Sequence, residues 1–212
     1  MAEPGARRCE RVATRRRPGD PDAMEIDAVW EFWFGALDAD GNAAPEVARR
    51  WWLKDAALDA EIGQRFGALH RAVVAGEREA WRAEPRGALA YVVVLDQFSR
   101  NLCRGAPGMF AADAQALAAA KAAVAAGHDR ALPVAPRGFF YLPYMHSEDL
   151  ADQDACVALF ADVPGAAQSV DFAERHRAII RRFGRFPHRN AILGRASTAE
   201  EEAFLREPGS SF

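Results

Sequence analysis

The sequence predicts an all-α protein, and three observations support this. Apolar residues recur at helical spacing along most of the chain, capping residues and glycines stand at the ends of these segments, and no run shows the alternation typical of a strand. No Asn-Gly or Asp-Gly pair lies between alternating segments, so no β-hairpin is expected. We expect about seven to nine helices, arranged as a compact bundle or as an α/α superhelix, and no sheet.

Capping residues and glycines mark the first three helices. Asp22 and Glu25 have the spacing of a capping box, and Gly35 closes the helix that they begin. Pro45 opens a short second helix, and Asp55 caps a longer third one. The apolar stripe of this third helix consists of Leu58, Ile62, Phe66, Leu69 and Val73.

The later helices carry similar signals. They are expected, in order, over residues 87–103, 107–127, 147–160, 169–183 and 198–207. Ser147 is expected to cap the third of these, and Gly184 ends the fourth. Thr198 and Glu201 have capping-box spacing at the start of the last.

The composition is that of an ordinary globular protein. Half of the 212 residues are hydrophobic and the formal net charge is −3, so no global positive potential favours nucleic acid. Three scattered cysteines, Cys9, Cys103 and Cys156, indicate a reducing compartment and no disulfide framework. No apolar run reaches the ~20 residues of a membrane span, and no apolar core of a secretory signal is present. We therefore expect a cytoplasmic protein without membrane contact.

The first 21 residues differ from the rest of the chain. They contain six arginines and almost no large apolar side chain, a composition that cannot offset its ordering entropy. We expect residues 1–21 to be a disordered tail and residues 22–212 to form a single all-α domain. Because the helical signals begin abruptly, translation starting at Met24 is a further hypothesis, which an intact-mass measurement tests.

Four polar residues interrupt the most apolar part of the expected central helix. Residues 88–95 are all apolar. Asp96, Gln97, Arg100 and Asn101 follow within one arc of roughly 140°, at about 100° per residue. This arc continues an apolar stripe, so these side chains are expected to face inward. A buried charge without a partner costs about 3–5 kcal/mol, so partners must come from elsewhere in the chain.

Two later stretches can supply these partners. Residues 144–150 contain His146, Glu148 and Asp149. The second stretch supplies His176, Arg182, Arg185, His188, Arg189 and Asn190. Its arginines can bind a phosphate or carboxylate, or can form structural ion pairs with the acidic residues.

Each candidate also has a structural interpretation. Glu148 and Asp149 stand in a first helical turn, where acidic residues are favoured anyway. His146 can be a general base, a ligand contact or a second capping group, and His176 in an apolar stripe is typical of a core residue. The spacing of His and acidic residues matches no metal-binding motif, and neither a glycine-rich phosphate loop nor a G-x-S-x-G elbow is present. We therefore expect no metal and no cofactor.

Several separated motifs resemble those of the DUF924 family. They are LDQFSRN at residues 95–101, LPYMHSED at 142–149 and RFGRFPHRN at 182–190. The other matching positions are Phe110, Asp113, Gln153, His176 and Arg177. The resemblance runs from about residue 26 to 205 and departs at Ser99, where such proteins commonly carry Pro. It implies a fold similar to the tetratricopeptide-repeat-like α/α superhelix, in a bacterial-type family of uncharacterised proteins, and it brings no established activity.

Three hypotheses for function follow. The leading one is a binding protein whose central polar site takes a small anionic ligand or an acidic peptide end. Its expected site residues are Asp96, Gln97, Arg100, Asn101, His146, Arg182, Arg185, Arg189 and Asn190. The second is a hydrolase-type enzyme, with His146 or His188 as general base and Glu148 or Asp149 orienting it. The third is a protein-interaction scaffold, whose polar core only fixes helix packing and whose exposed aromatic residues, near Trp51 and Trp52, carry the function.

Overall fold

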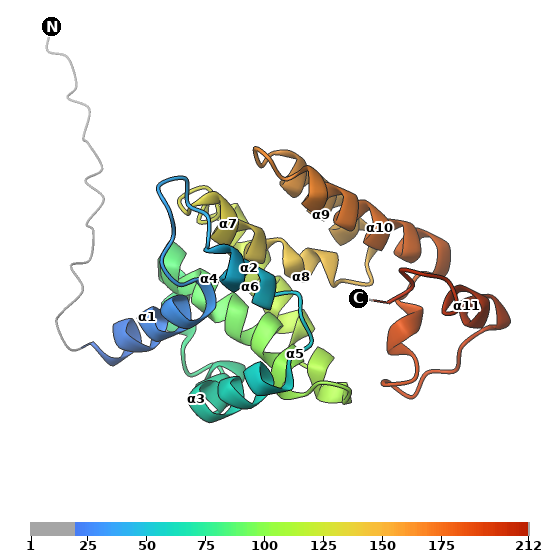
Figure 1. Cartoon of the computed structure of the whole chain (residues 1–212), viewed down its shortest axis with the longest axis horizontal. Coiled ribbons are helices and arrows are strands. Elements are labelled where there is room, and N and C mark those ends of the chain that lie inside the picture. The colour runs from blue at the N-terminus through green and yellow to red at the C-terminus, as the bar shows by residue number, and fades with distance from the viewer. Residues whose placement is uncertain (1–19, 212) are drawn as a thin grey trace, which may run out of the picture.

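The computed structural model describes residues 20–211, and its fold is all-α (Figure 1). Eight α-helical segments in this part of the chain have six or more residues, within the seven to nine that were expected. The β-type pairing in the described range consists of one isolated bridge between Leu37 and Ala43, so the prediction of a fold without a sheet is confirmed. Most of the expected tail, residues 1–19, lies outside the described residues. None of the described helices combines the length and hydropathy needed to cross a membrane.

The helical elements follow one another with short connections. The α-helices are α1 (Pro21–Phe34), α2 (Pro45–Arg50), α3 (Ala56–Val74), α4 (Pro85–Val93), α5 (Ser99–Leu102), α6 (Asp113–Ala125), α7 (Val134–Arg137), α8 (Leu142–Met145), α9 (Leu150–Ala161), α10 (Ala167–Phe183) and α11 (Ala199–Phe204). The 3₁₀ turns are η1 (Glu79–Ala83), η3 (Pro107–Phe110), η4 (Gly138–Phe140) and η5 (Pro187–Arg189), and η2 (Val94–Phe98) is a π-helical turn.

Several expected helix ends are confirmed. Asp55 caps α3 by accepting hydrogen bonds from the first-turn amides. Thr198 and Glu201 form the expected capping box of α11. Gly184 ends α10 in the left-handed conformation, with φ of 68°, which costs glycine little. The helix expected from residue 107 begins instead with the turn η3, and α6 starts only at Asp113.

Two expected caps are wrong. Asp20, not Asp22, caps α1, because Pro21 takes the first helical position, where its missing N–H costs nothing. Asp149, not Ser147, caps α9, with its Oδ1 2.7 Å from the amide of Ala151. The Ser147 hydroxyl donates to Asp152 instead.

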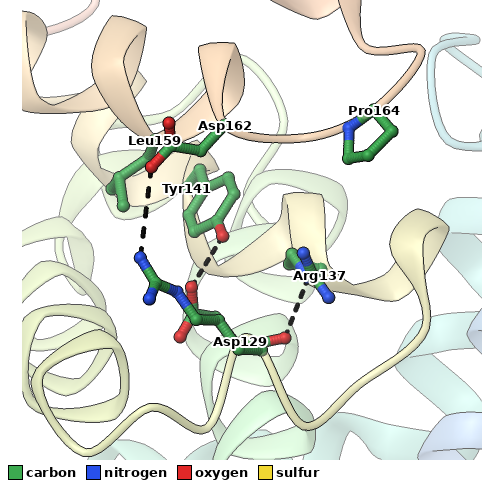
Figure 2. Close-up of a pocket in the computed structure, with 7 residues that line it drawn as sticks. Asp129, Arg137, Tyr141, Leu159, Asp162 and Pro164 are labelled. Carbon is green, nitrogen blue, oxygen red and sulfur yellow. Dashed lines mark hydrogen bonds and ion pairs between the residues drawn. The ribbon is translucent and has the colours of Figure 1, made fainter.

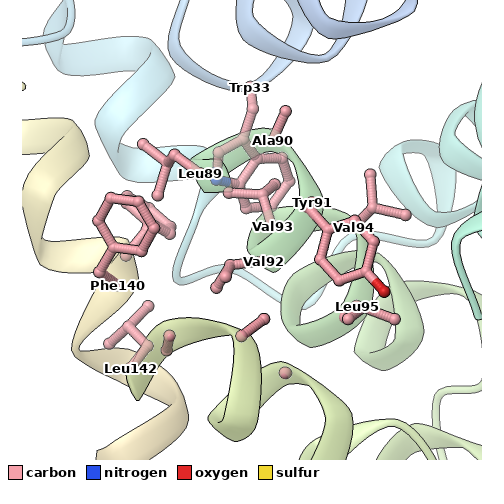
Figure 3. Packing of buried hydrophobic residues seen from close by; sticks show 14 of the residues in the cluster. Trp33, Leu89, Ala90, Tyr91, Val92, Val93, Val94, Leu95, Phe140 and Leu142 are labelled. Atoms are coloured by element: carbon pink, nitrogen blue, oxygen red, sulfur yellow. The ribbon is translucent and has the colours of Figure 1, made fainter. Parts of the chain in front are cut away.

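The helix α4 is the centre of the main apolar core. It contacts α1, α6, η1 and η4, and every residue from Gly87 to Phe98 is buried. Figure 3 shows its side chains packed against Trp33, Phe140 and Leu142. At the end of η2, the ring of Phe98 lies 5.1 Å from Phe66 and 5.5 Å from Trp33 between centroids. This dense packing fixes the position of the helix end that carries the polar residues Asp96 and Gln97.

The C-terminal part of the chain has a smaller core of its own. The helices α9 and α10 form a hairpin beside the main body (orange in Figure 1). At the C-terminal end of α10, Ile179 and Ile180 form a separate buried cluster with Phe186, against which Phe183 and Phe204 pack. The segment that carries the predicted arginines thus belongs to a second packing unit.

We predict that Phe98→Ala lowers the free energy of unfolding by about 3–5 kcal/mol, because it removes a fully buried ring and leaves a cavity. Urea unfolding followed by circular dichroism measures this. The matched control is Phe172→Ala on α10, where the ring is partly exposed and a loss below about 1 kcal/mol is expected. Equal losses in the two variants would contradict the placement of the core.

Candidate functional site

A closed ring of charged and polar groups joins the two packing units. The Nδ1 atom of His146 lies 2.8 Å from Oδ1 of Asp96, and Nη1 of Arg100 lies 3.1 Å from the same oxygen. Arg100 Nη1 also lies 3.0 Å from Oδ1 of Asp113. Arg189 closes the ring, because its Nη1 donates to Asp113 at 3.2 Å and its Nη2 to the backbone carbonyl of His146 at 2.9 Å. Two carboxylates thus balance two guanidinium groups.

Five elements bring these residues together. Asp96 lies in the π turn η2, Arg100 in α5 and Asp113 at the first position of α6. His146 follows α8, and Arg189 lies in η5 of the C-terminal unit. A π turn adds a residue to the helical repeat, and such turns are frequent at functional sites.

The same turn separates Asn101 from this ring. The Asn101 amide donates to Asp59 of α3 at 2.8 Å, and Arg104 binds the same carboxylate. Gln97 stays with the ring, because its Nε2 donates to Oδ2 of Asp96 at 2.6 Å. Asp96, Gln97 and Arg100 therefore contribute to the polar ring, whereas Asn101 contacts α3.

The protonation states of the central pair follow from their surroundings. Burial acts to raise the pKa of Asp96, but the charge of Arg100 and the contact with His146 outweigh it, and the pKa lies well below its usual value. Burial and the charge of Arg100 lower the pKa of His146, although Asp96 opposes this. At neutral pH, Asp96 is thus ionised and His146 neutral. A carboxylate only accepts hydrogen bonds, so Nδ1 of His146 carries the proton and Nε2 keeps its lone pair.

The Nε2 atom of the His146 imidazole is the chemically distinctive feature of the polar ring formed by Asp96, Arg100, Asp113, His146 and Arg189. Asp96 is only 1% exposed, whereas the His146 side chain keeps 18% of its surface exposed. Among the residues that the structure describes, Nε2 has no hydrogen-bond partner. A buried carboxylate therefore orients an imidazole whose basic nitrogen is available to another molecule.

Two arginine nitrogens of the ring are also without hydrogen bonds. Within residues 20–211, Nη2 of Arg100 and Nε of Arg189 are buried and have no hydrogen-bond acceptor. The Arg189 guanidinium lies between the rings of Phe110 and Phe186, at 4.6 and 4.7 Å from their centroids. Such stacking is typical of arginine and compensates part of the missing polar contact.

Glu148 links the segment that follows α10 to the main body through hydrogen bonds. Its carboxylate accepts two hydrogen bonds from Arg195, at 2.7 and 2.9 Å, and one from the amide of Phe186 at 2.8 Å. Burial acts to raise the pKa of Glu148, but these donors outweigh it and lower the pKa. Arg195 also donates to Asn190, which donates to Ser197. Glu148 and Asn190 thus serve one structural clamp, and the hydrogen bonds of Glu148 go to Arg195 and Phe186, which are not members of the ring.

Arg182 and Arg185 pair with α11. Arg182 lies 2.9 Å from Glu200 in an exposed pair, and Arg185 binds both oxygens of Glu201. The hydrogen bond from Arg185 is the main cause that lowers the pKa of Glu201 to about 2. The structure places these two arginines outside the ring, whereas it brings Arg189 into it.

Two further histidines lie next to Phe186. His176 and His188 have ring centroids 5.7 and 5.5 Å from the Phe186 ring. Burial lowers the pKa of His176 to about 3 and that of His188 to about 4. The charges of Arg189 and of Lys54 also lower the pKa of His188. No group of three or more His, Cys, Asp or Glu side chains that could hold a metal ion is found in the described range.

Sequence reasoning missed several members of these networks. Asp113, which completes the ring, is among the positions that match the family but not among the expected site residues, because it stands at a helix start, where an acidic residue is ordinary. Arg195 and Asp59 lie outside the polar stretches and carry no motif of their own. The spacing of the Arg-rich stretch also gave no means to tell Arg189 from Arg182.

We predict that Arg189→Ala lowers the free energy of unfolding by about 2–5 kcal/mol, because it leaves Oδ2 of Asp113 and the backbone carbonyl of His146 without their donor. Arg100 still pairs with Oδ1 of Asp113 in this variant. Arg182→Ala is the matched control, since its pair with Glu200 is exposed and contributes about 0–1 kcal/mol. Urea unfolding of both variants measures the difference. Equal effects would show that the ring is no more stabilising than a surface pair.

We predict that His176 makes stability depend on pH. Its pKa is lowered from 6.5 to about 3 in the folded protein. Between these values the unfolded chain binds a proton that the folded protein excludes, so stability decreases as the pH falls through this window. The loss is about 1.4 kcal/mol per pH unit. Urea unfolding between neutral pH and about pH 5 is expected to show a smaller slope for His176→Gln, and an unchanged slope would contradict this origin.

Comparisons with known proteins place this chain among uncharacterised relatives. A search of curated proteins finds no match. A solved structure, that of a protein of unknown function, ATU0120, from Agrobacterium tumefaciens, is similar with a TM-score of 0.78 and 38% sequence identity, covering 87% of this chain and 98% of that one. Residues 29–209 match the family model described as bacterial protein of unknown function (DUF924). The chain therefore belongs to the DUF924 family.

Proposed function

We propose that this protein is a hydrolase-type enzyme in which His146 acts as the general base and Asp96 orients it. The observation that carries the proposal is the geometry of this pair: Nδ1 lies 2.8 Å from a buried carboxylate, and Nε2 has no partner among the described residues. The same division of roles, with one nitrogen held by a carboxylate and the other accepting a proton, underlies catalytic triads.

The proposal replaces Glu148 and Asp149 by Asp96 as the orienting group. Glu148 already accepts three hydrogen bonds in the clamp, and Asp149 caps α9. Asp96, by contrast, directly contacts the imidazole. Its negative charge stabilises the imidazolium that forms when His146 takes a proton.

The proposed chemistry is activation of water. Nε2 of His146 removes a proton from a water molecule while the water oxygen bonds to an acyl or phosphoryl centre of the substrate. The bond to the leaving group then breaks, and the imidazolium returns its proton to that group. Arg100, whose guanidinium shares Asp96 with His146, supplies positive charge next to this step.

Binding of a small anionic ligand is the second candidate, favoured by the two buried arginine nitrogens that lack acceptors. Two observations limit which arginines can bind such a ligand and which charge the ligand can carry. Arg182 and Arg185 pair with α11, and the two carboxylates of the ring already balance Arg100 and Arg189. Because Nε2 of neutral His146 is an acceptor, the ligand that fits best carries both an acidic O–H and an acceptor oxygen. A phosphate or a carboxylic acid meets this requirement.

We predict that His146→Gln abolishes turnover, tested on a panel of chromogenic carboxyl and phosphate esters, and that Asp96→Asn lowers kcat strongly. In a Ser-His-Asp triad the corresponding change costs about 10⁴. The rate of the wild-type enzyme is expected to fall on acidification, at a pH below the usual imidazole pKa, because burial lowers the pKa of His146. His128→Gln changes a histidine that is outside the ring and lines a cavity with Glu79 and Arg82, and it is the control that retains activity.

Activity that survives His146→Gln would overturn the enzyme proposal. A wild-type protein that hydrolyses no ester, yet is stabilised by inorganic phosphate in a thermal-shift assay only while Arg100 is intact, would favour the ligand-binding candidate. If neither is observed and a stable protein partner co-purifies, the scaffold hypothesis gains, and Trp52, whose side chain is 66% exposed, is then the first residue to test.

A further inference from the structure

We propose that a cavity separate from the His146 ring binds a small zwitterion such as an α-amino acid. The cavity has a volume of about 420 Å³, within the usual range for small-molecule sites. It lies where the turn after α6, the helix α7 and the C-terminal end of α9 meet (Figure 2). The residues on which the proposal rests are Asp129, Arg130, Arg137, Tyr141 and Asp162.

Asp129 supplies a buried acceptor for the ammonium group. Only 3% of Asp129 is exposed, and its Oδ2 accepts a hydrogen bond from the Tyr141 hydroxyl at 2.7 Å. Within the described part of the chain, its Oδ1 has no hydrogen-bond partner. Burial and the contact with Asp129 raise the pKa of Tyr141, so its hydroxyl stays protonated and continues to donate. A buried carboxylate oxygen without a donor is costly, and a ligand N–H group would relieve that cost.

Arg137 supplies a fixed donor for the carboxylate group. Its Nε donates to the backbone carbonyl of Asp129 at 3.0 Å and its Nη2 to that of Leu132 at 3.2 Å. Neither acceptor is charged, and within residues 20–211 Nη1 of Arg137 has no hydrogen-bond or ion-pair partner. The guanidinium is thus oriented by two backbone carbonyls, and its positive charge is available to pair with the carboxylate of a ligand.

Arg130 can complete the carboxylate site. Its side chain is 76% exposed and lies 4.0 Å from the equally exposed Asp162, in a loose pair at the rim of the cavity. Figure 2 shows Asp162 on the same side of the cavity as Tyr141, and the contacts of Asp129 with Tyr141 and Arg137. Arginine binds carboxylates through strong, frequently bidentate hydrogen bonds, so Arg130 and Arg137 are both suitable donors for a ligand carboxylate.

The charge pattern favours a zwitterion over a simple ion. Two arginines and two aspartates line the same space, so a lone anion or a lone cation meets like charge as well as opposite charge. A molecule with an ammonium and a carboxylate places each charge against its complement. This site is independent of the proposed activity, because His146 precedes α9 and Asp162 follows it, and 12 residues of helix span about 18 Å.

Titration calorimetry with L-alanine as the ligand tests this proposal. We expect L-alanine to bind the wild-type protein more tightly than acetate or ethylamine, each of which carries only one of its charges. Asp129→Asn, which keeps an acceptor for the Tyr141 hydroxyl, and Arg130→Gln are each expected to weaken binding at least tenfold. Arg175→Gln, an exposed arginine of α10 paired with Asp171, is the matched control and is expected to bind like the wild type.

Absence of heat with L-alanine, or acetate binding as tightly as L-alanine, would overturn the proposal. So would an unchanged affinity in Arg130→Gln, whose exposed side chain makes misfolding an inadequate explanation. Circular dichroism of Asp129→Asn separates lost binding from lost structure. Backbone amide shifts on adding L-alanine are expected near residues 129–141 and 159–164, and shifts confined to residues near His146 would contradict this location.

Discussion

The burial of the Asp96 carboxylate is the constraint on which the rest of this structure depends. The main apolar core fixes where this residue lies, because the turn that carries it continues a helix that is buried on all sides. An unpaired charge there would cost several kcal/mol. Asp96 therefore needs polar partners around it. Gln97 lies beside it in η2, Arg100 comes from α5, and His146 follows α8.

Polar contacts, more than apolar ones, connect the C-terminal segment that follows α10 to the main body. Phe186 of this segment packs with Ile179 and Ile180 of α10 in an apolar cluster that is separate from the main core. The junction is formed by Arg189 in the ring and by Glu148, which binds Arg195 and the amide of Phe186. Contacts of this kind require fixed geometry, so they define how the two units are oriented. His146 lies at this junction, because its backbone carbonyl accepts a hydrogen bond from Arg189.

The sequence was sufficient for the fold class and for most helices, because spacing and capping are local signals. It was also sufficient to identify Asp96, His146 and Arg189 as polar residues that need partners. It could not show the π turn, which depends on packing and divides the polar residues of the central helix so that Asn101 joins Asp59. Nor could it separate Arg189 from Arg182, since both stand in one Arg-rich stretch and only tertiary contacts distinguish them.

The carbonyl of His146 receives its hydrogen bond from Arg189, a residue near the end of the chain. During synthesis the N-terminal part is available to fold first, so Asp96 can already contact the imidazole while the carbonyl of His146 still lacks the donor that Arg189 later supplies. A truncated product that lacks the segment after α10 would retain the apolar core around α4. It would lack the hydrogen bond from Arg189 to the carbonyl of His146. Completion of the site is thereby coupled to synthesis of the segment that follows α10.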